Sequence, residues 1–362
     1  MSRFLTKVSS IQIHKLRISR QVLVIAALCV SGIPASAASF TTSVFATGSA
    51  VSGTAPDSVT YGNGSLWVEY GNGASSTDYT GASTIAQYSL SGSVQNTYSI
   101  KGSVDGLKYD PNTGLVWALQ NQDANSKLSV INPATKVISS YTYGAPYTSV
   151  ASSRGFDDVA FIGSNVYLSE SNPSSPGDPI VVKLNNPTPS SPITVSTVLT
   201  GTGILGADPD SLKSTPSGGL VLTSGNESAL TFITNPGLAT QSAHSVKLSG
   251  AAGSKLSLDD SIYATSTAGT FYVADTKTNT VYAISATGLI PGSSLFADVG
   301  YAFGSANPGT GAFTSISSGS GLHGIAFVPS ATATPEPSTL AISVLGAGLV
   351  LIAIHRRRLA KK

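Results

Sequence analysis

The chain is almost devoid of cysteine, which limits both its covalent cross-links and its metal chemistry. Its one cysteine, Cys29, lies in an N-terminal segment that we expect to be removed. The remaining body has no thiol for a disulfide or for nucleophilic catalysis. It also holds only two histidines, His244 and His323. Two histidines without a cysteine argue against a zinc site.

Charged residues are scarce as well, at 10% of the chain, and they are unevenly placed. Ten of the 20 basic residues lie in the two end segments, whereas 17 of the 18 acidic residues lie in 38–334. The net charge of this body is thus 10 − 17 = −7. An acidic body argues against nucleic acid or an anionic lipid surface as a partner. The sequence also lacks a Gly-x-Ser-x-Gly nucleophile elbow and a phosphate-binding loop.

The N-terminus has the layout of a secretory signal peptide, which we assign to 1–37. A basic stretch precedes a short apolar run at 22–30, and Ala35 and Ala37 form a small-x-small cleavage site around Ser36. The apolar run is too short to cross a bilayer, so cleavage is favoured over anchoring. The mature chain is expected to begin at Ala38.

The C-terminus carries a second targeting segment. Its parts are the turn-forming Pro335-Glu336-Pro337, an uncharged apolar span at 338–354, and a basic end at 355–362 that contains Arg356, Arg357 and Arg358. At about 1.5 Å per residue, this span is near the minimum for a transmembrane helix. The arginines should stay on the cytoplasmic side, which places the body outside the cytoplasm. A plain membrane anchor is the simpler interpretation.

In motif, span and order, this tail resembles the PEP-CTERM sorting signal of exopolysaccharide-producing Gram-negative bacteria. The resemblance implies that an exosortase-type membrane protease cuts the chain near 331–337. The protein would then pass through the inner membrane, be transiently anchored, and reach the cell surface or the extracellular matrix. Exopolysaccharide and other surface proteins are the partners that the resemblance implies.

The body repeats a pattern of an aspartate, an apolar strand, a Gly/Asn turn and a second apolar strand. The leading residues, 48, 52, 53 and 50 positions apart, are Asp57, Asp105, Asp157, Asp210 and Asp260. Two further strands follow in each copy, and a partial sixth copy begins at His323. Four strands in about 50 residues are typical of a β-propeller blade. We therefore predict an all-β propeller over 38–330.

The predicted ring has about six four-stranded blades, of which five are complete repeats. The strands at 40–46 and 324–328, with 313–316, would form a composite sixth blade that joins the two ends. A five-bladed ring with spare edge strands is the alternative. The segment 259–283, with Tyr272-Val273-Ala274-Asp275-Thr276, resembles bacterial NHL- or YVTN-type propellers.

The five leading aspartates are the candidate site. If they lie at one level near the axis, their carboxylates converge and must bind protons or a cation. Oxygen ligands favour Ca²⁺, the one cofactor the sequence suggests. The simpler interpretation is that each aspartate accepts backbone N–H groups in a turn. Trp67 and Trp117 are likewise expected in the core, or alternatively as a platform for sugars.

Two functions remain. The first is a non-enzymatic binding or structural protein of the cell surface, which the absence of any catalytic motif favours. The second is a Ca²⁺-dependent hydrolase of the lactonase type, with its metal on the propeller axis. No motif identifies catalytic residues.

Overall fold

The computed structural model describes residues 37–330 except 121, 123–124, 148–153, 205–208 and 251–252. All its strands lie between Ser39 and Pro329. The signal peptide up to residue 36, the motif at 335–337, the span at 338–354 and the basic end lie outside the described residues. Among those described, no helix has the length and apolarity to cross a bilayer.

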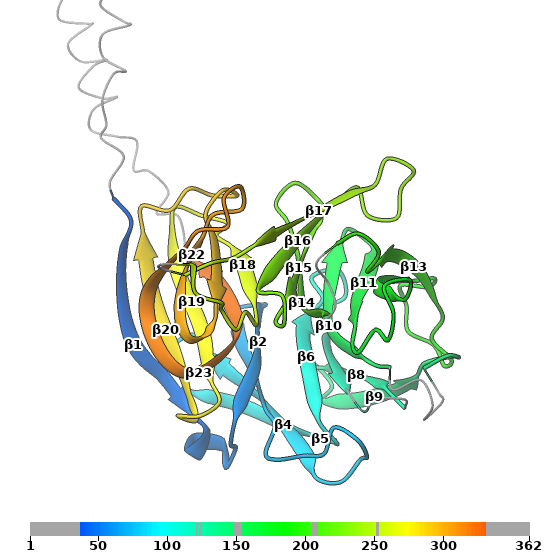
Figure 1. Cartoon of the computed structure of the whole chain (residues 1–362). Coiled ribbons are helices and arrows are strands. Elements are labelled where there is room, and N and C mark those ends of the chain that lie inside the picture. Colours follow the sequence, from blue (N-terminus) through cyan, green and yellow to red (C-terminus); the bar gives the residue numbers. More distant parts are fainter. Residues whose placement is uncertain are drawn as a thin grey trace, which may run out of the picture. The chain divides into compact units, whose positions relative to one another are not determined.

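Four separate sheets of four antiparallel strands follow one another along the chain (Figure 1). The first sheet contains β2 (Pro56–Gly62), β3 (Ser65–Tyr70), β4 (Ala82–Ser89) and β5 (Val94–Lys101). The second contains β6 (Val104–Tyr109), β7 (Val116–Gln120), β8 (Lys127–Asn132) and β9 (Val137–Thr142). The third contains β10 (Phe156–Ile162), β11 (Asn165–Glu170), β12 (Pro179–Leu184) and β13 (Val195–Thr200). The fourth contains β14 (Pro209–Ser214), β15 (Leu220–Ser224), β16 (Ala229–Thr234) and β17 (Ser242–Lys247).

Local sequence explains why each repeat folds into a blade. Asn63 and Gly64 both have positive φ, 48° and 73°, as a two-residue hairpin turn between β2 and β3 requires. All six residues of β3 are buried, as expected for a strand with sheets packed on both faces. Trp67 and Trp117 are only 1% and 2% exposed and lie in hydrophobic clusters between neighbouring blades. They therefore pack the core rather than offer a sugar platform.

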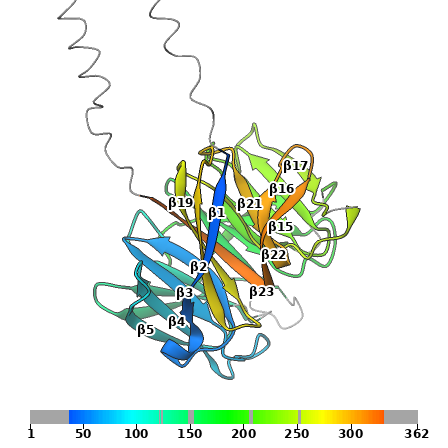
Figure 2. The same ribbon diagram turned by 90° about the vertical axis from the view of Figure 1, so that its left-hand side faces the viewer.

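The fifth sheet has seven strands in the order β1-β20-β19-β23-β22-β21-β18. These strands are β1 (Ser39–Thr47), β18 (Ser261–Tyr263), β19 (Ala268–Asp275), β20 (Thr280–Thr287), β21 (Leu295–Asp298), β22 (Gly300–Ala306) and β23 (Phe313–Pro329). A 3-10 helix, η1 (Gly48–Val51), follows β1. Figure 2 shows β1 and β23 of this sheet beside the first blade, where β23 contacts β2.

The prediction of six separate blades is wrong, because the fifth repeat and the closing segment merge into this one sheet. The 17-residue β23 pairs with β22 along its first part and with β19 along its second part. Leu322, at the junction, pairs with both neighbours. Glycines at 319, 321 and 324 surround this junction, and Gly324 has a φ of 46°. The flexible backbone thus lets one strand continue where two blades were expected.

The pairing of the fifth repeat also differs from the prediction. Strand β18 pairs with β21, whereas β19 and β20 lie on the other side of β23. The N-terminal strand β1 pairs antiparallel with β20. It belongs to the same sheet as β23, but the two strands are not hydrogen-bonded neighbours. The two ends of the body are therefore joined in one sheet, as expected, but by different partners.

Each four-stranded sheet gives one innermost strand, and the seven-stranded sheet gives two, β18 and β23; each of these six strands contacts the next one. The order is β2, β6, β10, β14, β18 and β23, and β23 returns to β2. This closed ring is the propeller arrangement, and it brings the N-terminal ends of β2, β6, β10, β14 and β18 together with the part of β23 around His323. These ends carry the aspartates of the candidate site.

Candidate functional site

The leading aspartates lie at β-bulges. Asp57, Asp105, Asp157 and Asp210 are each the second residue of an inner strand, and each strand has a register shift at that point. A bulge takes one residue out of the ladder and redirects its side chain, which is a common device beside functional sites. His323 lies at the corresponding register shift in β23. The sequence pattern thus marks a repeated structural feature.

The fifth aspartate of this level is Asp259, and Asp260 lies one residue deeper. Ser169 Oγ in the third blade donates a hydrogen bond to the carbonyl oxygen of Asp210, at 2.7 Å. Thr223 Oγ1 in the fourth blade donates the equivalent bond to the carbonyl oxygen of Asp259, at 2.6 Å. The expected level therefore holds Asp259, and the alignment of the fifth repeat is shifted by one residue.

These side chains surround a cavity of about 160 Å³, which we call the axial well. Its outer ring consists of Asp57, Asp105, Asp157, Asp210, Asp259 and His323. Its inner cluster consists of Asp158, Ser211, Lys213 and Asp260. All five aspartates chosen from the sequence thus line one cavity, four of them in the outer ring and Asp260 in the inner cluster.

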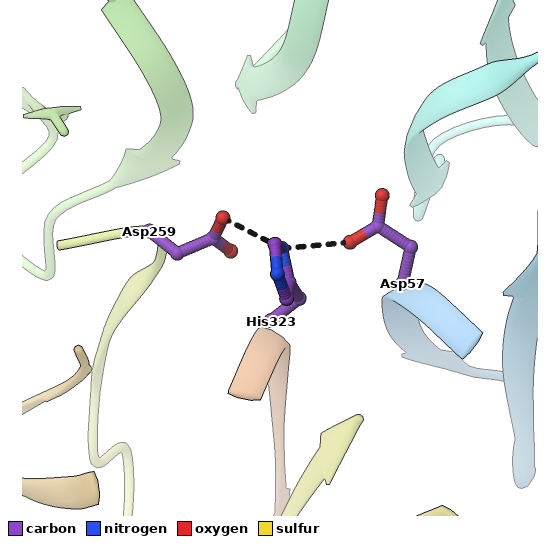
Figure 3. Close-up of side chains that lie close together, drawn as sticks. All are labelled: Asp57, Asp259 and His323. Carbon is purple, nitrogen blue, oxygen red and sulfur yellow. Dashed lines mark ion pairs between the residues drawn. The ribbon is translucent and has the colours of Figure 1, made fainter. Parts of the chain in front are cut away.

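Three groups of the outer ring lie close enough to share a cation. His323 lies between Asp259 and Asp57, which face it from opposite sides (Figure 3). His323 Nδ1 is 2.9 Å from Asp259 Oδ1 and 3.3 Å from Asp57 Oδ1. One donor atom from each of the three lies within 4.8 Å of the other two. This set combines carboxylate oxygens with one imidazole nitrogen.

The charges of the outer ring change its proton affinity. Burial alone would lower the pKa of His323, but the hydrogen bonds and charges of Asp259 and Asp57 outweigh it and raise this pKa to about 12. Burial raises the pKa of Asp57 in spite of the His323 charge. Burial, with the neighbouring aspartates, also raises the pKa of Asp210 well above its ordinary value. Positive charge is therefore strongly favoured in the well.

The inner cluster is held together by Lys213. Its Nζ lies 2.8 Å from Asp158 Oδ2 and 2.9 Å from Asp260 Oδ1. The same carboxylates accept backbone N–H groups from the next inner strand: Asp158 from Leu212 at 3.0 Å, and Asp260 from Ile325 at 2.7 Å. Of the leading aspartates, Asp260 also accepts the N–H of the next residue, Ser261, at 2.6 Å, which is the local bond of the simpler interpretation. Lys213 is the charged floor of the well.

Sequence reasoning missed two acids behind the well. Glu69 and Asp298 follow the apolar segments of β3 and β21 and are fully buried. Asp298 Oδ1 accepts the N–H of Asp260 at 3.1 Å. Burial raises the pKa of both carboxyl groups well above their ordinary values. An acid at the end of an otherwise apolar strand was the available signal.

A side pocket of about 460 Å³ opens on the well. It shares Asp210, Asp259 and His323 with the outer ring, and it adds Asn226 and Lys255. A ligand in this pocket would therefore contact the acidic groups of the well directly. The second histidine of the body, His244, is not part of either cavity.

Neither a protein-family model nor a curated protein matches this chain. Among solved structures, it is similar to virginiamycin B lyase from Staphylococcus aureus, with 12% identity and a TM-score of 0.44 over 77% of this chain and 74% of that one. A putative gluconolactonase has 12% identity and a TM-score of 0.47 over 75% and 79%. A protein of unknown function from Bacteroides caccae has 10% identity and a TM-score of 0.48 over 75% and 86%. These likenesses concern the fold alone.

Proposed function

We propose that this chain is an exported, surface-sorted binding protein whose propeller holds a divalent cation in the axial well. One observation carries the cation part. Acids occupy five of the six positions of the outer ring, and donor atoms of Asp57, Asp259 and His323 lie within 4.8 Å of one another. Converging carboxylates must take up protons or a cation.

The donor set fits more than one metal class. Carboxylates alone suit Ca²⁺, as the sequence suggested, whereas the imidazole of His323 suits Zn²⁺ and other transition metals. The well supplies both kinds of donor at one end of the ring. Lys213 closes the floor with its own positive charge, so the outer ring is the place for the added cation.

Equilibrium titration of the purified protein with Ca²⁺, Mn²⁺ and Zn²⁺ tests this part. The wild type should bind at least one of them, and the double variant Asp57→Asn/Asp259→Asn should lose that binding. The variant Asp78→Asn, which changes an exposed aspartate of a loop, is the matched control. Undiminished binding by the double variant would reject the assignment.

The export part of the proposal is supported by the two end segments of the sequence. We propose that the tail is cut near Pro335-Glu336-Pro337 by an exosortase-type protease and that the body then joins the exopolysaccharide layer. Alanine at these three positions should leave the protein in the membrane fraction of the producing cell. Release at the wild-type level would contradict sorting by this motif.

A second candidate is a cation-dependent hydrolase of the lactonase type, favoured by the side pocket beside the well. A substrate bound there would lie against Asp210, Asp259 and His323. In the absence of a cation, the pKa of His323, about 12, is too high for an efficient general base at neutral pH. Lactone turnover that requires a divalent cation and disappears in Asp259→Asn would favour the hydrolase. The absence of turnover would favour the non-enzymatic binding protein.

A further inference from the structure

A separate pocket of about 500 Å³ lies at the other end of the inner strand β14. Asp210, in the outer ring, is the second residue of this strand, whereas the pocket begins at Thr215, just after the last one. Its walls come from the β14–β15 turn, from β16 and β17, from Tyr263 of β18, and from Gly292 and Pro308. Its volume is in the range of sites for small ligands.

Aromatic rings form part of the wall. Phe232 and His244 are directly opposite each other on β16 and β17, and their rings stack at 5.3 Å with an interplanar angle of 24°. His244 is exposed and covers Phe232, which is 9% exposed. Tyr263 adds a third ring, whose hydroxyl is neutral at physiological pH like that of any tyrosine. A flat apolar surface is thus combined with a polar group.

The lining selects against charged ligands. Among the described residues that form this pocket, none is an aspartate, glutamate, lysine or arginine. A charged ligand would lose its hydration without finding a counter-charge. A wholly apolar ligand would instead strip water from the hydroxyls of Thr234 and Tyr263, whereas those of Thr215 and Ser217 bond to each other at 3.0 Å. The ligand must therefore be uncharged, with an apolar face and several hydroxyl groups.

We propose that this pocket binds one unit of a neutral saccharide, with an apolar face of the sugar against His244 and its hydroxyls near Tyr263. A pyranose ring meets both requirements, since its C–H groups form an apolar face and its hydroxyls lie around the edge. The proposal extends the binding role given above, and it does not depend on a cation in the axial well.

Calorimetric titration with hexamers of neutral α-glucan, β-glucan, mannan and chitin tests the proposal. Oligogalacturonate serves as the negatively charged comparison. The wild type should bind a neutral oligosaccharide and not the charged one. His244→Ala should weaken that binding about tenfold, because it removes the exposed ring. Tyr263→Phe, which removes only a hydroxyl, should weaken it as well. Tyr301→Ala, at a 52% exposed tyrosine of β22, should leave it unchanged.

Two results would overturn the proposal: no binding of any neutral oligosaccharide at millimolar concentration, or binding that neither pocket variant changes. Preference for an apolar aromatic probe over every sugar would also contradict it. The same titrations with Asp57→Asn/Asp259→Asn should give the wild-type saccharide affinity. A failure of the cation site and a failure of this pocket are thus seen separately.

Discussion

The imidazole of His323 lies 2.9 Å from the carboxylate of Asp259, although the two residues are far apart in the chain. His323 comes from β23, which closes the ring, and Asp259 lies just before β18. The closing strand therefore supplies the one basic group of an outer ring that otherwise consists of aspartates. Its charge opposes the mutual repulsion of these acids.

His323→Gln should therefore lower the stability of the protein in the presence of a chelator. We expect a loss of about 1 kcal/mol, since the side chain is 38% exposed and solvent weakens its ion pairs. Because its pKa is raised to about 12, the His323 contribution is complete below about pH 6.5 and decreases as the pH rises toward 12. Urea unfolding at pH 6 and pH 9 measures this.

Lys247, an exposed residue of β17, provides the control for that experiment. Lys247→Gln should change the free energy of unfolding by less than about 0.5 kcal/mol at both pH values. Equal losses in the two variants, or a larger loss for His323→Gln at pH 9 than at pH 6, would contradict the role given to His323.

Removal of Lys213 should be more costly. Lys213→Met removes the cation that contacts both Asp158 and Asp260, 5% and 2% exposed, and leaves the charge of Lys108 acting on them. Removing one partner of a buried ion pair costs about 3–5 kcal/mol. Denaturant unfolding should show a loss of this size, and Lys255→Met, at an exposed lysine, should show none. A loss below 1 kcal/mol would mean that Lys213 does not hold the inner cluster together.

Phe45 of β1 connects the two ends of the ring. Its ring lies 4.7 Å from that of Tyr272 on β19 and 5.7 Å from that of Tyr88 on β4 in the first blade. Phe45→Ala should destabilise the protein by about 3 kcal/mol, the low end for a phenylalanine, because Phe45 is only partly buried. Val44→Ala, at a 60% exposed neighbour, is the control. Similar unfolding midpoints for both variants would argue against closure through β1.

Stability should also depend on pH through Glu170. Burial raises the pKa of this carboxyl group to about 7, although Tyr147 donates to it at 2.7 Å and Arg154 lies 3.3 Å away. Ionisation of Glu170 thus lowers the free energy of unfolding as the pH rises from about 4.5 to 7, and this loss is complete above pH 7. Glu170→Gln should remove this loss, so its melting temperature should exceed that of the wild type more at pH 8 than at pH 5. A constant difference across this range would disprove the assignment.

The sequence was sufficient for the regular part of the fold. Asp57, Asp105, Asp157 and Asp210 recur with the four strands of each blade, and each lies at the same bulge. In the fifth repeat, two adjacent aspartates allow two registers, and the spacing alone did not distinguish them. Equivalent hydrogen bonds from Ser169 to Asp210 and from Thr223 to Asp259 show that Asp259 is the residue that corresponds to Asp210. Such contacts join residues distant in the chain, so local pattern does not contain them.

The merged seven-stranded sheet was hidden for the same reason. The first and second parts of β23 read as separate strands because glycines divide them, yet the backbone continues through Leu322. The partner of β19 depends on how residues distant in the chain close the ring. The alternation of residues within β19 does not distinguish one partner strand from another. Glu69 and Asp298 were missed because an acid that follows apolar residues does not by itself show that its carboxyl group is buried, as both of these are.

The most direct test of the axial well is thermal unfolding of the purified protein with chelator and with each divalent cation. A cation at 100 times its dissociation constant should stabilise the folded state by about 2.7 kcal/mol and raise the midpoint. Asp57→Asn/Asp259→Asn should unfold at one temperature under all conditions. An unchanged wild-type midpoint with Ca²⁺, Mn²⁺ and Zn²⁺ would contradict the cation site.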